Sequence, residues 1–195
     1  MKKKLFAGLA VGVMMLGMAG VASANSISIN FDAVTTYASV DQFYNGGTDS
    51  AGASGPNYGV AFFGFVTTTG FGETSQPNLA YGSTGNDYVN VYGGFTALSF
   101  TDGQFGPSTM SVYSGLDGTG IMLGSTALSG NPYAFAPQSV SFSGIGKSFV
   151  ITSSGGTAGI DDVVLSTNAP VPEPATMLLI GTGLAGLIGA RRKKK

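Results

Sequence analysis

The sequence predicts an all-β protein whose main domain is an antiparallel β-sandwich, and three observations predict this fold class. Short apolar and β-branched runs recur between residues 25 and 169, and several of them alternate with polar residues. The chain has 32 glycines, many of them where turns would separate those runs. Residues that favour helices are scarce in the same region. Many short strands in one domain are typical of a sandwich.

Residues 1–24 have the pattern of a secretory signal peptide. Three lysines follow the first methionine, an apolar run occupies residues 5–21, and Ala22 and Ala24 frame a small-residue cleavage site. Cleavage there makes Asn25 the first residue of the mature protein. The alternative is an uncleaved membrane anchor, against which the cleavage site argues.

The predicted strands begin directly after the signal peptide. Residues 26–31 alternate strictly, with isoleucine and phenylalanine on one face. Residues 59–66 form a continuous apolar stretch typical of a central strand. Two more strands, 88–92 and 95–100, are separated by a pair of glycines.

A hairpin is predicted next along the chain. Residues 110–113 alternate between apolar and polar side chains, and residues 121–123 are apolar. The turn signal at 117–120 lies between them. The remaining predicted strands are residues 139–143, 148–152 and 160–165.

Residues 45–59 differ from the rest, because glycine, asparagine and aspartate occur throughout and no apolar period is present. We expect a long loop. Long loops inside a compact domain are often functional, so this loop is either a functional element or a flexible surface connection.

The region between residues 25 and 169 is strongly acidic. Of the chain's nine basic residues only Lys147 lies there, whereas of its ten acidic residues only Glu173 lies outside. Such a surface repels nucleic acid and anionic lipid, so no nucleic-acid partner is expected, and it suits hard cations and neutral sugars. The region has the size of one domain and contains no cysteine, so packing must stabilise it without disulfides.

The chain contains neither histidine nor cysteine. This excludes serine–histidine and cysteine–histidine catalysis and histidine-based zinc sites, so we expect a non-catalytic protein. The alternative is a secreted carboxylate-dependent carbohydrate-active enzyme. It would need two carboxylates across a sugar ring, and Glu73 is the one glutamate of the exported region that could pair with an aspartate.

Glycan binding would need aromatic platforms, and the chain has no tryptophan. Tyr44, Tyr58, Tyr81 and Tyr133 lie in or near predicted loops, where their rings could stack on sugars. We take Tyr44 and Tyr58 as the candidate glycan contacts. The alternative is that these tyrosines cover sheet edges and keep their hydroxyls in water.

Residues 170–195 have three parts in fixed order. The first part holds Val171, Pro172, Glu173 and Pro174. A nearly uncharged run follows at 175–190, and five basic residues at 191–195 end the sequence. Proline keeps the first part extended. The uncharged run can insert as a transmembrane helix, although it is shorter than the roughly 20 residues usually needed to cross a membrane. The basic tail stays in the cytoplasm. A plain tail anchor is the alternative.

This arrangement resembles the PEP-CTERM sorting signal of exported bacterial proteins. The resemblance implies recognition near Pro172–Pro174 by an exosortase, a membrane protease, in a Gram-negative bacterium that makes exopolysaccharide. It implies a protein that is anchored transiently in the inner membrane and then reaches the cell surface or extracellular matrix. There it would associate with exopolysaccharide, as in a biofilm.

A second resemblance concerns the domain itself. Residues 43–47, 55–60 and 112–120 are similar to a recurrent ectodomain of PEP-CTERM proteins, and Ile160–Val163 is similar to the last strand of galactose-binding-like jelly rolls, which include carbohydrate-binding modules. The resemblance implies a jelly-roll-like sandwich at residues 25–169, between the cleaved signal peptide and the sorting helix.

Asp32, Asp161 and Asp162 are candidate ligands of a structural Ca²⁺. Consecutive residues of a strand point to opposite faces, so Asp161 or Asp162 would bring a carboxylate inward or to the rim, where a cation would offset the cost. In the jelly rolls that the domain resembles, a calcium ion often joins the first and last strands, and Asp32 ends the first predicted strand. The alternative is that these carboxylates are solvated or bound by backbone N–H groups.

Overall fold

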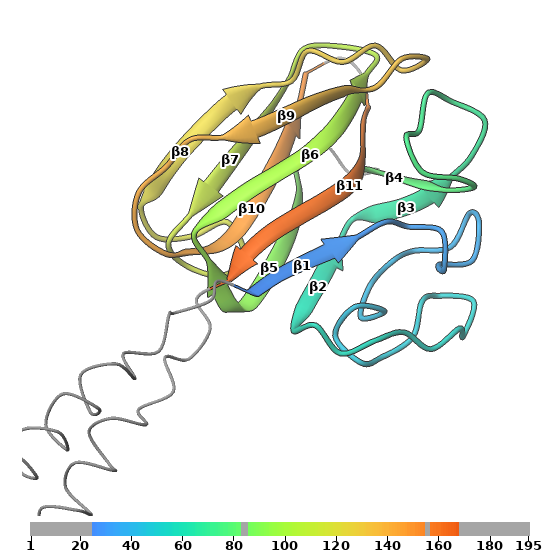
Figure 1. Cartoon of the computed structure of the whole chain (residues 1–195), viewed down its shortest axis with the longest axis horizontal. Coiled ribbons are helices and arrows are strands. Elements are labelled where there is room, and N and C mark those ends of the chain that lie inside the picture. Colours follow the sequence, from blue (N-terminus) through green and yellow to red (C-terminus); the bar gives the residue numbers. More distant parts are fainter. Residues whose placement is uncertain (1–24, 83–85, 155–156, 168–195) are drawn as a thin grey trace, which may run out of the picture. The chain divides into compact units, whose positions relative to one another are not determined.

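The computed structural model describes residues 25–82, 86–154 and 157–167, which form a two-sheet antiparallel β-sandwich (Figure 1). The predicted fold class is therefore confirmed. The signal peptide predicted for residues 1–24, and the sorting motif, apolar run and basic tail predicted for residues 170–195, lie outside the described residues. Within the described part of the chain there is no helix long and apolar enough to span a membrane.

Six strands form the first sheet, called sheet I, in the order β3-β4-β11-β6-β9, with β1 also paired to β11. Their bounds are β1 Asn25–Ile29, β3 Phe65–Thr68, β4 Leu79–Gly82, β6 Ala97–Gln104, β9 Ala136–Val140 and β11 Ala158–Thr167. Five strands form sheet II, in the order β2-β5-β10-β7-β8. Their bounds are β2 Val60–Phe63, β5 Asn86–Phe95, β7 Ser108–Tyr113, β8 Met122–Ala127 and β10 Gly146–Ser153.

The central strand predicted for residues 59–66 is wrong. The chain forms two strands there, β2 at the edge of sheet II and β3 at the edge of sheet I. Gly64 lies between them with a φ of 83°, a backbone conformation that glycine adopts readily and that turns the chain from one sheet to the other. The predicted hairpin is confirmed as β7 and β8, with Asp117 and Gly118 at positive φ in the connection.

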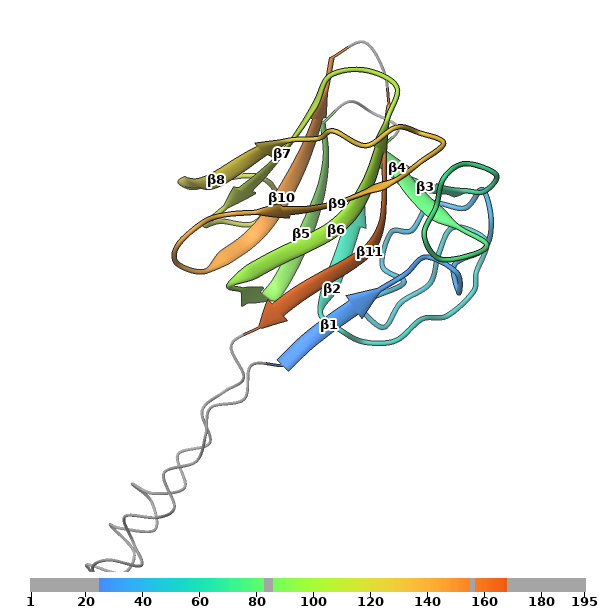
Figure 2. The same cartoon turned by 45° about the horizontal axis from the view of Figure 1, so that its top comes forward.

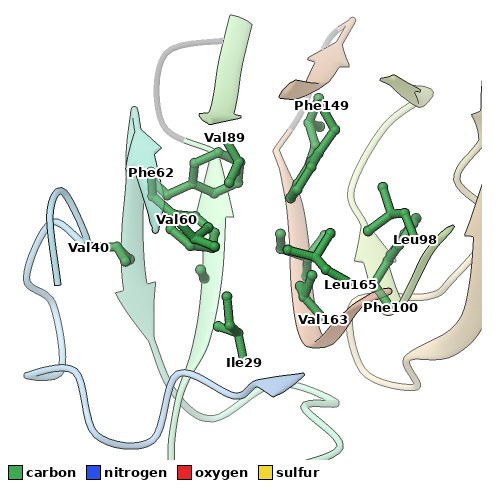
Figure 3. Close-up of a cluster of buried hydrophobic side chains, with 14 of the residues drawn as sticks. Ile29, Val40, Val60, Phe62, Val89, Leu98, Phe100, Phe149, Val163 and Leu165 are labelled. Carbon is green, nitrogen blue, oxygen red and sulfur yellow. The ribbon is translucent and has the colours of Figure 1, made fainter. Parts of the chain in front are cut away.

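The core lies between the two sheets. Figure 3 shows Phe62 and Val89 of sheet II and Val163 and Leu165 of sheet I among its side chains, and all four are fully buried. Each such side chain contributes about 1.5–3 kcal/mol when it leaves water. β1 and β11 lie side by side in this sandwich, as Figure 2 shows, and pair antiparallel along the whole of β1.

A β-bulge interrupts β11 at Asp161 and Asp162. Asp161 and Val164 pair with residues of β6 that are only two positions apart, and Asp162 has a φ of 47°. Strict alternation after the buried Ile160 would turn Val163 outward, but the extra residue returns it to the core. The strict alternation of side chains between the two faces, which the sequence analysis assumed for Asp161 and Asp162, is therefore broken here.

The carboxylate of Asp161 is fully buried on the outer side of sheet I, beneath the loop between β3 and β4. It accepts the backbone N–H groups of Thr74 at 3.1 Å, Ser75 at 2.9 Å and Asp162 at 2.8 Å. Burial raises the pKa of Asp161 above its ordinary value, although these hydrogen bonds act in the opposite direction. The N–H donors thus tie the loop to the strand.

Asp49 organises the loop predicted for residues 45–59. It accepts the N–H groups of Thr35 at 2.9 Å, Ala51 at 3.0 Å and Ala53 at 2.9 Å. Desolvation alone would raise the pKa of Asp49, but these hydrogen bonds bring it below its ordinary value. The loop is therefore held by an internal carboxylate.

Asp102 on β6 is a third buried carboxylate, and its hydrogen bonding is incomplete. Its Oδ2 atom accepts the N–H groups of Gly130 at 2.8 Å and Ser129 at 3.2 Å. Its Oδ1 atom is buried with no partner among the described residues. Burial raises the pKa of Asp102, against the effect of the two N–H donors.

Replacing Asp161 by alanine should destabilise the domain strongly, because three N–H groups lose their acceptor. We expect the free energy of unfolding of fragment 25–169, which contains every described strand, to fall by about 3 kcal/mol in urea denaturation. Asp32→Ala is the matched control, since Asp32 accepts one hydrogen bond, from the Asn78 N–H at 3.2 Å. Equal losses in both variants would contradict the assigned role.

Asp102→Asn should stabilise the same fragment at neutral pH. Folding raises the pKa of Asp102, so the folded state favours the protonated side chain. Its contribution to stability is therefore fully present at pH values below the pKa in the unfolded chain, and it is lost as the pH rises through the pKa in the folded protein. The amide is uncharged at every pH and so avoids this loss, and its oxygen can still accept the N–H groups of Ser129 and Gly130. We expect a gain of about 1–2 kcal/mol at pH 7 that shrinks towards acid pH. Urea denaturation across a pH series measures it, and a variant less stable than the wild type at pH 7 would overturn this interpretation.

Candidate functional site

The two tyrosines predicted as glycan contacts have different environments. Tyr44 is only 3% exposed, and its hydroxyl donates to the carbonyl of Asn30, so its ring cannot face a ligand at the surface. Burial, reinforced by nearby Asp32, raises its pKa. Tyr58 is 44% exposed and stacks on Tyr44, with ring centroids 6.2 Å apart. A glycan contact at Tyr58 stays a prediction.

Calcium binding by Asp32, Asp161 and Asp162 also stays a prediction. The structure brings Asp32 and Asp161 near the hydroxyl of Tyr44, where both charges act on its pKa. However, the described residues contain no group of three or more acidic, histidine or cysteine side chains that could hold a metal ion. Backbone N–H groups already provide Asp161 with the compensation that the prediction assigned to calcium.

A groove of about 200 Å³ crosses the outer face of sheet I. Two glycines, Gly159 of β11 and Gly103 of β6, pair directly on its floor, and Tyr81 of β4 pairs with Gly159 on the other side. The ring of Phe135 uses the space that the glycines leave, since a Cβ atom at Gly103 would lie 2.3 Å from it. The two glycines in register therefore let the Phe135 ring lie against the sheet at the floor of the groove.

Three aromatic rings from three separate loops meet at the groove, and we call them the aromatic rim. Phe71 follows β3, Phe105 follows β6 and Tyr133 precedes β9. The Phe71 ring lies 5.8 Å from Phe105 and 5.9 Å from Tyr133, and the last two are 6.2 Å apart. Phe105 is 55% exposed and Tyr133 69% exposed, so the rim presents apolar ring surface to solvent.

Backbone contacts hold the loops of the rim together. The N–H of Gly72 donates to the Pro132 carbonyl at 2.9 Å, and the N–H of Phe135 donates to the Gly72 carbonyl at 3.3 Å. A Cβ atom at Gly72 would lie 2.4 Å from the Ala134 nitrogen, so only glycine permits this approach. The loops after β3 and β8 approach one another in Figure 2 for this reason.

Glu73, the residue on which the enzymatic alternative depends, is a structural acceptor in this loop. It is buried, and its carboxylate accepts the N–H groups of Gly70 at 2.9 Å and Phe71 at 2.8 Å. These bonds orient the backbone that carries Phe71 to the rim. The arrangement occupies both oxygens of the carboxylate.

Tyr37 forms part of the groove wall in an unusual conformation. It is 71% exposed and has a φ of 66°, a value that bulky residues rarely adopt. Its N–H donates to the Thr67 carbonyl at 3.1 Å, which holds the backbone in place. The Tyr37 ring is therefore held at the surface beside the groove.

None of the residues that line the groove is charged. Lys147, the one cation between residues 25 and 169, belongs to sheet II, where its ammonium donates to the Tyr92 carbonyl at 3.2 Å. The groove therefore offers ring faces, hydroxyls and backbone groups, and it has no cation with which to bind an acidic ligand.

A second cavity, here called the end hollow, lies at the end of the sandwich and has a volume of about 670 Å³. The turn from β6 to β7, the loop after β8 and the end of β10 surround it. Its exposed polar side chains are Ser129, Asn131, Thr152 and Ser154. Phe105 lines both the groove and the end hollow.

Sequence reasoning found only part of this site. It singled out Tyr81, which lines the groove, and Tyr133, whose ring contacts two groove residues. It did not single out Phe71, Phe105 or Tyr37. A usable signal was the segment Gln104–Pro107, where a phenylalanine precedes a Gly-Pro turn and has no apolar neighbour in sequence. The pairing of the two floor glycines had no sequence signal, because it depends on strand register.

Comparisons with known proteins found a sorting motif in the sequence and weak similarity to several solved structures. Residues 170–193 match the PEP-CTERM protein-sorting motif. No curated protein matches the chain. Among solved structures, a family 29 carbohydrate-binding module is 14% identical, with a TM-score of 0.44 and coverage of 74% of this chain and 94% of that one.

Two further solved structures are similar to this chain to a comparable degree. The family 29 module complexed with mannohexaose is 13% identical, with a TM-score of 0.45 and coverage of 75% of this chain and 94% of that one. A glycoside hydrolase family 43 arabinoxylan arabinofuranohydrolase from Bacillus subtilis is 12% identical, with a TM-score of 0.40 and coverage of 62% and 31% respectively. All three TM-scores are below 0.5, so these similarities carry no conclusion about the fold or the ligands of this protein.

The match at residues 170–193 agrees with the three-part pattern that the sequence predicted there. Such a motif marks an exported protein that an exosortase processes for the cell surface. The chain thus carries a PEP-CTERM protein-sorting motif at its C-terminal end, after an all-β sandwich domain.

Proposed function

We propose that this protein is a non-catalytic glycan-binding protein of the cell surface or extracellular matrix, where it associates with exopolysaccharide. The observation that carries the proposal is the uncharged groove with its aromatic rim on sheet I. The C–H face of a sugar ring packs on an aromatic ring while the sugar hydroxyls keep their hydrogen bonds, so exposed rings beside polar groups suit glycans.

The charge distribution supports a neutral glycan as the ligand. The groove has no cation to pair with an acidic sugar, and the domain around it carries many carboxylates and one lysine. An anionic polymer would therefore meet repulsion without a compensating contact.

The hydrogen bonds of Glu73 argue against the alternative of a carboxylate-dependent enzyme. A general acid must be able to give its proton to the leaving group, and Glu73 instead accepts two backbone N–H groups within its own loop. We therefore expect the protein to bind polysaccharide without turnover.

Phe105→Ala should weaken binding of neutral exopolysaccharide from the producing bacterium by about tenfold, because stacking surface is lost at the centre of the rim. Isothermal titration calorimetry with the protein from Asn25 onward, purified in detergent, measures this. Tyr92→Ala is the matched control, since Tyr92 is also an exposed aromatic residue but belongs to sheet II. If Tyr92→Ala weakens binding as much as Phe105→Ala does, the ligand does not use the rim.

Processing at the sorting motif should remove the C-terminal end in cells. Intact-mass analysis of the protein from strains with and without the exosortase gene measures this. We expect a shortened C-terminus only in the first strain, and retention in the inner membrane for Glu173→Ala. A protein that still ends in Lys195 in both strains would rule out exosortase cleavage.

A further inference from the structure

We propose that the groove and the end hollow form one extended binding site, and that its ligand is an internal stretch of a polysaccharide chain rather than a terminal sugar. This inference rests on the proposed function, because it specifies which part of a glycan the same surface takes. Its starting point is Phe105, which lines both cavities.

Neighbouring residues line the two cavities. Gln104 and Asn131 line the end hollow, and Pro132, which follows Asn131, lines the groove. The N–H of Gln104 donates to the Gly130 carbonyl at 3.1 Å, so the turn after β6 and the loop after β8 are joined there. A ligand that passes over Phe105 therefore goes directly from one cavity to the other.

The sizes of the cavities favour a ligand that uses both. Ligand sites usually occupy roughly 300–1,000 Å³. The groove alone, at about 200 Å³, is below this range, whereas the end hollow, at about 670 Å³, is within it. A single sugar can stack in the groove but leaves the larger cavity empty, while a chain fills both.

The chemistry of the two cavities is complementary along such a chain. The groove offers ring faces, on which the apolar face of a sugar packs, and the end hollow offers the exposed polar side chains of Ser129, Asn131, Thr152 and Ser154. No charged side chain lines either cavity. Both halves therefore suit the same class of ligand, a neutral polysaccharide.

Asp102 supports the end hollow from beneath. Its Oδ2 atom accepts the N–H groups of Ser129 and Gly130, which both line the end hollow. Its Oδ1 atom is buried without a partner among the described residues, and so is the Oε1 atom of Gln104. Both oxygens belong to residues of β6, and one of these residues, Gln104, lines the end hollow. Buried oxygens without partners cost stability.

The test is the dependence of affinity on chain length. Neutral exopolysaccharide from the producing bacterium is hydrolysed and separated by length, and each fraction is titrated into the protein from Asn25 onward in detergent. We expect fragments of about six sugars to bind roughly tenfold more tightly than fragments of two. Thr152→Arg, at an exposed position of the end hollow, should remove this gain and leave the affinity of the short fragments unchanged.

The control is Ser139→Arg, which adds the same charge at an exposed position of β9 outside both cavities and should preserve the gain. If short and long fragments bind the wild type equally well, or Thr152→Arg keeps the full gain, the extended site is wrong while glycan binding by the groove stands. If no fragment binds, the proposed function itself fails, and the extended site fails with it.

Discussion

The β-bulge at Asp161 and Asp162 is the constraint on which both faces of sheet I depend. The extra residue lets β11 bury Val163 and Leu165 in the core after Ile160, each contributing about 1.5–3 kcal/mol. On the outer face it leaves the carboxylate of Asp161 beneath the loop after β3, where backbone N–H groups surround it. Without the bulge, the strand would expose its apolar residues or bury a carboxylate in the core, and either change is costly.

The acidic character of the domain has a structural use. Asp161 and Glu73 hold the loop after β3, and Asp102 holds the loop after β8, in each case by accepting backbone N–H groups. These are the loops that carry Phe71 and Tyr133 to the aromatic rim. Asp161 and Glu73, which sequence reasoning considered for calcium binding or catalysis, accept the N–H groups that fix this loop. The groove itself is uncharged.

The sequence was sufficient for the fold class, because period-two alternation and turn residues identify strands locally, as the confirmed β7–β8 hairpin illustrates. It was insufficient where one residue changes the direction of the chain, at Gly64 between the sheets and at Asp162 in the bulge. The binding groove was harder still. Gly103 and Gly159 are far apart in sequence and meet only through the register of β6 and β11, which local patterns do not encode.

The most direct test of glycan binding at the groove is the change in amide chemical shifts of fragment 25–169 on titration with neutral exopolysaccharide fragments. If the glycan binds in the groove, the largest changes should be centred on Gly103, Phe105 and Gly159. Changes centred instead on the outer face of sheet II, where Phe63 and Tyr88 stack at 4.8 Å, would contradict it.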